Sequence, residues 1–77
     1  MPVEQDVPIR NLMIRLGQLL KLAGVISSGA EVKAFLSAGT AYVNGEPESR
    51  RGRQLFPGDV VLVGEHELRV TSAEDVP

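Results

Sequence analysis

Two short helical stretches, each followed by a glycine, set the main constraint on how this chain can fold. In the first stretch the apolar residues recur on one helical face, and Gly24 is a natural residue to end the helix. The apolar residues concerned are Leu16, Leu19, Leu20 and Ala23. The pattern predicts a helix over residues 16–23 whose apolar face must pack against another part of the fold.

The second stretch opens with a capping box. Ser28 can accept a hydrogen bond from the amide of Glu31, and the Glu31 side chain can reach back to the start of the helix. The apolar residues again fall on one face, and Gly39 ends the helix. Only residues 25–27 separate the two stretches, so we expect a compact hairpin of two short helices.

Short strands and tight turns account for most of the remaining sequence. Asn44-Gly45 is the strongest turn signal, because a type I′ hairpin turn needs positive φ at both of its central positions. Pro57-Gly58-Asp59 predicts a second turn. Strands are expected over residues 41–43, 46–49, 60–63 and 67–71.

Two segments have a less regular pattern. Residues 9–16 fit both a helical stripe and a strand, and a strand ending near Arg15 is favoured because Gly17 makes a poor helix interior. Residues 50–53 are predicted to form a polar loop. After this loop, Leu55 and Phe56 are expected to return to the core.

The length of 77 residues suffices for one domain. We expect the folded domain to span residues 9–71, between a flexible N-terminal segment at 1–8, which contains Pro2 and Pro8, and a C-terminal tail at 72–77. The chain has no cysteine for disulfide or thiolate chemistry. It also has neither a secretory signal nor an apolar run long enough to cross a bilayer, which predicts a cytoplasmic protein without membrane contact.

Charge is unevenly distributed along the chain, although the net charge is only −2. Residues 10–63 contain seven basic and four acidic side chains, whereas the acids predominate at both ends. A basic middle is compatible with a nucleic-acid partner, but by itself it is a weak signal.

Five pieces of the sequence occur in an order and spacing that point to one family. They are residues 16–24, residues 28–33, Val43-Asn44-Gly45, Arg50-Arg51-Gly52-Arg53 and Pro57-Gly58-Asp59. Together they resemble the S-four RNA-binding domain, named after the fourth protein of the small ribosomal subunit. Within that family the chain is most similar to stand-alone bacterial proteins like the one called YbcJ. The resemblance covers residues 14–63.

The resemblance implies both a fold and an activity. The implied fold class is α+β, with two short packed helices against a small, bent, mostly antiparallel sheet, the αL RNA-binding motif. The implied activity is non-catalytic binding of structured RNA, ribosomal or transfer RNA, in translation or ribosome assembly. The expected partners are RNA and the ribosome or an RNA-modifying enzyme, and the protein is expected to be a monomer without a small-molecule substrate.

Carried over to this sequence, the resemblance implies an RNA-binding surface on the helical hairpin and the loop at residues 50–53. Lys and Arg can hold phosphates, as can a hydroxyl at a helix N-terminus, and Gly52 would let the loop backbone approach closely. The expected RNA-binding residues are Arg15, Gln18, Lys21, Ser28, Lys33, Arg50, Arg51, Gly52 and Arg53.

No group in the sequence indicates an enzyme, a cofactor or a metal site. Glu46 and Glu48 are expected in an exposed hairpin, where nothing would shift their pKa values toward those of a general acid or base. His66 is the only histidine, and it lacks the partners of a metal site.

The alternative to RNA binding is a protein-interaction module that retains the fold with weak RNA affinity. The acidic ends of the chain favour it. Replacing Arg50, Arg51 and Arg53 together by Ala should separate the two hypotheses, and should leave the fold intact because these side chains are expected to be exposed.

Overall fold

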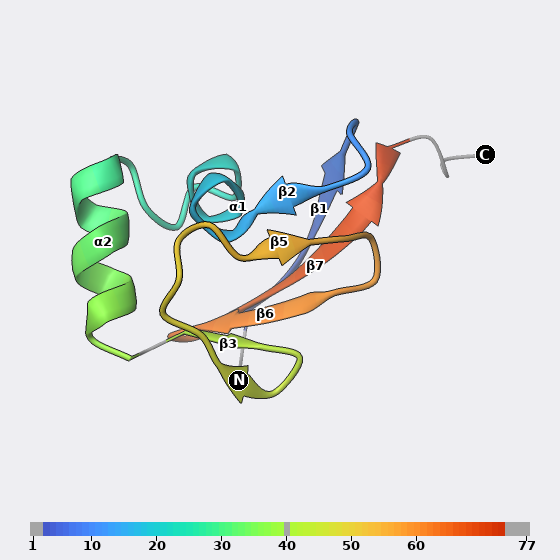
Figure 1. Ribbon diagram of the computed structural model, residues 1–77. Coiled ribbons are helices and arrows are strands. Elements are labelled where there is room, and N and C mark those ends of the chain that lie inside the picture. The colour runs from blue at the N-terminus through green and yellow to red at the C-terminus, as the bar shows by residue number, and fades with distance from the viewer. Residues whose placement is uncertain (1–2, 40, 74–77) are drawn as a thin grey trace.

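The computed structural model describes residues 3–39 and 41–73, which form two helices and seven strands (Figure 1). In chain order the elements are β1 Val3–Ile9, β2 Ile14–Arg15, α1 Leu16–Leu22, α2 Gly29–Ser37, β3 Ala41–Val43, β4 Glu46–Pro47, β5 Gln54–Leu55, β6 Val60–Val63 and β7 His66–Ser72.

The strands form two sheets. The larger has the order β1-β7-β6-β3-β4, and every neighbouring pair in it is antiparallel except β1 with β7, which is parallel. The smaller sheet pairs β2 with β5, and α1 continues directly from β2 (Figure 1). The expected α+β class, with two helices on a mostly antiparallel sheet, is confirmed.

The N-terminal segment differs from the expectation of flexibility. Residues Val3–Ile9 form β1, which pairs along its whole length with His66–Ser72 of β7. Val7 and Ile9 are buried in the core, and this burial of alternate residues stabilises the strand although the segment contains Pro8. Pro8 is compatible with this position because β1 lies at the edge of the sheet.

The core lies between the larger sheet and the helical hairpin. Alternate residues of β6 and β7 face it, as the period of two in a strand requires, and the helices add one apolar face each. Its fully buried larger side chains are Leu16, Leu19, Leu20, Val32, Leu36, Val43, Leu55, Val61, Val63, Leu68 and Val70.

The predicted helix ends and turns are largely confirmed. Gly24 and Gly39 follow the helices with positive φ, and Asn44 and Gly45 both have positive φ in the hairpin between β3 and β4. The Ser28 hydroxyl accepts a hydrogen bond from the Glu31 amide at 3.3 Å. The Glu31 carboxylate does not complete the expected capping box in the usual way, but accepts from the Ser27 hydroxyl at 3.2 Å.

The segment from residue 9 to 16 is neither one helix nor one strand. β1 ends at Ile9, the chain bends, and the two-residue strand β2 follows, so a strand does end at Arg15 as expected, but the expectation of a strand through the whole stretch is wrong. Leu55 is buried as predicted, whereas the expectation for Phe56 is wrong. Phe56 is the next residue after β5 and its side chain is 49 % exposed.

Candidate nucleic-acid interface

The loop at residues 50–53 is fastened to the start of α1 by main-chain hydrogen bonds. The amide of Leu16 donates to the carbonyl of Arg53, and the amide of Gly17 donates to the carbonyl of Arg51, both at 2.9 Å. These amides belong to the first turn of the helix and would otherwise lack a partner. The loop therefore serves as the N-terminal cap of α1, and its side chains are held next to those of the helix.

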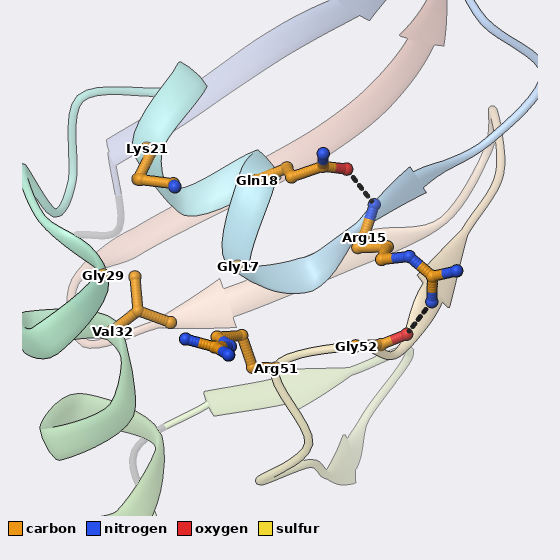
Figure 2. Close-up of a pocket in the computed structure, with 8 residues that line it drawn as sticks. All are labelled: Arg15, Gly17, Gln18, Lys21, Gly29, Val32, Arg51 and Gly52. Carbon is orange, nitrogen blue, oxygen red and sulfur yellow. Dashed lines mark hydrogen bonds between the residues drawn. The ribbon is translucent and has the colours of Figure 1, made fainter.

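Arg15 adds a side-chain contact to the same junction. Its Nη1 donates to the carbonyl of Gly52 at 3.0 Å, and its own amide donates to Oε1 of Gln18 at 3.2 Å (Figure 2). A guanidinium has five N–H groups, so Arg15 can hold the loop and still donate to a ligand.

Gly17 allows the loop to approach this closely. A Cβ at this position would lie 2.6 Å from Cγ of Arg51 and 3.4 Å from Cγ1 of Val32. The stem of Arg51 thus occupies the space that any other residue at position 17 would fill. A glycine that weakens the helix by propensity is required here by packing.

A pocket of about 340 Å³ opens between the two helices and the loop. Figure 2 shows the Arg51 side chain extending toward Val32, while Arg15 turns to Gly52 at the other end of the site. Among its lining residues are three cations and no carboxylate. We call this site the cationic pocket; it is lined by Arg15, Gly17, Gln18, Lys21, Gly29, Val32, Arg51 and Gly52.

Glu48 differs most from its expected setting. Its side chain is only 7 % exposed and accepts from Nε of Arg50 at 3.0 Å and from Nη1 of Arg53 at 2.8 Å. The Arg50 amide donates to it as well, at 3.1 Å. The hydrogen bonds from Arg50, supported by those from Arg53, outweigh the effect of burial and lower the pKa of Glu48 from 4.5 to about 2.

The prediction that nothing shifts the pKa of Glu48 is therefore wrong, although the direction of the shift makes Glu48 a worse general acid or base at neutral pH.

The expectation that the triple arginine variant leaves the fold intact does not fit this arrangement either. Arg50 and Arg53 neutralise a buried carboxylate, and removing both would leave that charge without its partners.

A second concavity, of about 700 Å³, borders the cationic pocket at Arg15 and Gly52. It shares these two residues with the cationic pocket and contains the exposed ring of Phe56. We call it the aromatic groove; it is lined by Arg15, Arg50, Gly52, Arg53, Gln54, Phe56 and Asp59.

The predicted RNA-binding residues thus fall into three groups. The cationic pocket brings together Arg15, Gln18, Lys21, Arg51 and Gly52. Arg50 and Arg53 line the aromatic groove and bind Glu48. The structure places Ser28 at the N-cap of α2, next to the pocket residue Gly29, and Lys33 on the exposed surface of α2, outside the lining of both concavities.

Sequence reasoning missed three residues of this region. The sequence indicates Gly17 only as a poor residue for a helix interior. No sequence pattern predicts its contact with Arg51. Glu48 gives no signal because its partners depend on how the loop folds back. Phe56 could have been found from strand alternation, since its neighbour Leu55 faces the core.

Comparison with known proteins identifies the family. The S4 domain family matches residues 7–71, so this chain belongs to the S4 domain family, the S-four class that the sequence resembles. A probable ribosome maturation protein, RlbA, of Bacillus subtilis is 56 % identical over 57 residues, which are 74 % of this chain and 80 % of that protein. The small ribosomal subunit protein uS4m of Schizosaccharomyces pombe is 37 % identical over 54 residues, 70 % of this chain but only 16 % of that protein.

Neither helix in the described part of the chain is long and apolar enough to span a membrane.

Proposed function

We propose that this protein is a non-catalytic RNA-binding module that contacts ribosomal RNA during ribosome maturation. The observation that carries the proposal is the cationic pocket, in which Arg15, Lys21 and Arg51 line one concavity without a carboxylate. The resemblance to a ribosome maturation protein over most of the chain supports ribosomal RNA over transfer RNA. We expect the protein to act in the cytoplasm, as a monomer and without a cofactor.

Phosphate groups are the RNA feature that this pocket fits best. Arg51 and Arg15 can each donate two parallel hydrogen bonds to phosphate oxygens, and Lys21 adds a compact point charge. Arg51 is held by its packing against Gly17, and Arg15 by its bond to Gly52, so little side-chain freedom is lost on binding. Contacts of this kind recognise the shape of the RNA backbone rather than its sequence.

The proposal is tested by crosslinking in cells. RNA would be crosslinked to tagged protein and recovered, with Arg51→Ala and Lys33→Ala variants alongside. We expect defined ribosomal RNA segments to be enriched with the wild-type and Lys33→Ala proteins and to be depleted with Arg51→Ala. Equal recovery by all three proteins would contradict the assignment of the pocket, and recovery of transfer RNA instead would change the proposed target.

A protein-binding role is the second candidate, favoured by one apolar surface. Leu22 is exposed and lines a shallow concavity of about 430 Å³ together with Met13 and Ile14. Exposed apolar side chains that gather at one site are a common feature of protein contacts. Recovery of a partner protein that is unaffected by Arg51→Ala and lost in a Leu22→Ser variant would support this role.

A further inference from the structure

We infer that the aromatic groove binds an unpaired base, which stacks on Phe56 next to the phosphate-binding cationic pocket. This inference rests on the proposed RNA-binding function and adds to it a preference for RNA with unpaired nucleotides. Phe56 is half exposed, and it lies in the same concavity as Arg15, Arg50 and Arg53. An aromatic face beside arginines is a common protein surface for a splayed-out base.

The charges of the two sites differ, as expected if one binds the anionic phosphate of a nucleotide and the other its neutral base. The cationic pocket has three cations and no acid. In the aromatic groove Arg50 and Arg53 share the buried carboxylate of Glu48, and Asp59 contributes a further negative charge. Arg15 faces both sites, so the groove has a smaller excess of positive charge than the pocket, which makes it less favourable for a phosphate and better suited to a neutral base.

The Phe56 ring extends from a rigid piece of backbone. The Phe56 amide donates to Oδ2 of Asp59 at 2.8 Å, and the Asp59 amide returns a bond to the Phe56 carbonyl at 2.9 Å. Oδ1 of Asp59 accepts from Nδ2 of Asn44 at 3.1 Å, and the Asp59 carbonyl accepts from the Val70 amide at 2.9 Å. The backbone that carries the ring therefore needs no ordering when a base stacks on it.

The cationic pocket and the aromatic groove are adjacent, which determines where the base would lie relative to the phosphate. Arg15 and Gly52 line both concavities, so a strand whose phosphate lies in the cationic pocket passes directly into the aromatic groove. The carboxylate of Asp59 retains lone pairs for an amino group on the edge of the base.

Fluorescence of a single tryptophan tests the inference, because the natural chain contains none. Phe56→Trp would be titrated with an RNA hairpin that carries an adenosine loop, and with a blunt duplex of the stem sequence. We expect the hairpin to quench the emission and the duplex to leave it unchanged. Tyr42→Trp is the matched control, since Tyr42 is 40 % exposed on β3 and lies outside the groove.

Affinity measured by anisotropy of labelled RNA separates the possible outcomes. Phe56→Ala and Phe56→Leu should weaken binding of the hairpin about 5- to 150-fold, the equivalent of about 1 to 3 kcal/mol of stacking, while Phe56→Tyr retains it. Binding of the hairpin without quenching in Phe56→Trp, or without loss in Phe56→Leu, would overturn the base site and leave the phosphate site standing. No binding of either RNA by the wild-type protein would instead overturn the proposed function.

Discussion

At the scale of single residues, Glu48 determines what the arginine-rich loop can do. It accepts hydrogen bonds from both Arg50 and Arg53, so two of the three arginines in the loop are engaged within the protein. Of the three arginines in the loop, Arg51 is the one that lines the cationic pocket. One buried carboxylate thus divides a run of like charges into two arginines that pair with it and a third, Arg51, which lines the pocket and is proposed to bind phosphate.

The lowered pKa of Glu48 predicts a pH dependence of stability. Its pKa is about 2 in the folded protein and 4.5 ordinarily, so the unfolded chain binds more protons between these values and stability is lost as the pH falls. Because the carboxylate is nearly buried but Arg50 is mostly exposed, we expect a contribution of about 2 kcal/mol above pH 4.5.

Urea unfolding of the wild-type and Glu48→Gln proteins at several pH values measures this contribution. The stability advantage of the wild-type protein should be present above pH 4.5 and should vanish toward pH 2. A difference between the two proteins that does not vary with pH would contradict the ion-pair account.

Gly17→Ala should separate RNA affinity from stability. The new Cβ would displace the stem of Arg51, which it would otherwise approach to 2.6 Å, and should therefore weaken RNA binding. The better helix propensity of Ala, about 1 kcal/mol, offsets part of the packing cost in the thermal unfolding curve. Gly29→Ala serves as the control in the unfolding measurement alone, since a Cβ there meets nothing within 4 Å but Gly29 also lines the pocket. Unchanged RNA affinity in Gly17→Ala would show that the position of Arg51 is unimportant.

At the scale of elements, β1 shows where sequence patterns fail. The helices, the Asn44-Gly45 turn and β6 were predictable because periodicity, capping and turn chemistry agree at those places. β1 was not, because its pairing with β7 joins residues more than 60 positions apart and leaves no local signal. The candidate site was predictable in part. The sequence and the family resemblance indicated the loop and the helices, but packing decides which of their cationic side chains pair with an acid of the protein and which line the pocket.

Ile9→Ala tests the structural role of β1. Ile9 is buried in the core, and truncation of a buried Ile costs about 2 to 5 kcal/mol, which is a large part of the stability of a small domain. A pronounced fall in the thermal midpoint is expected. A midpoint close to that of the wild-type protein would mean that the segment is as flexible as the prolines first indicated.

The cap of α2 offers a second test at this scale. Ser28 accepts from the Glu31 amide, so Ser28→Ala should lower the free energy of unfolding by about 1 kcal/mol. Ser28→Asn should restore most of that loss, because Asn is an equally good cap. Equal stability of all three proteins in urea would show that the hydroxyl does not stabilise the helix.

At the scale of the whole molecule, an acidic protein presents a basic site. The net charge is −2, yet the helical hairpin and the loop together form a pocket with three cations. The acids are concentrated toward the chain ends, and Glu4 and Asp6 lie on β1, which pairs with β7 at the edge of the larger sheet. Net charge is therefore a poor guide to the partner of this chain, and the local arrangement of charges is a better one.

The salt dependence of RNA binding tests the cationic pocket most directly. Three phosphate contacts predict a slope of log K against log salt of about −2 to −3. Lys21→Ala should reduce its magnitude by about 1, whereas Lys33→Ala, an exposed lysine on α2 outside the pocket, should leave it unchanged. Equal effects of the two substitutions would mean that RNA responds only to overall charge, and would contradict a built phosphate site between α1, α2 and the loop.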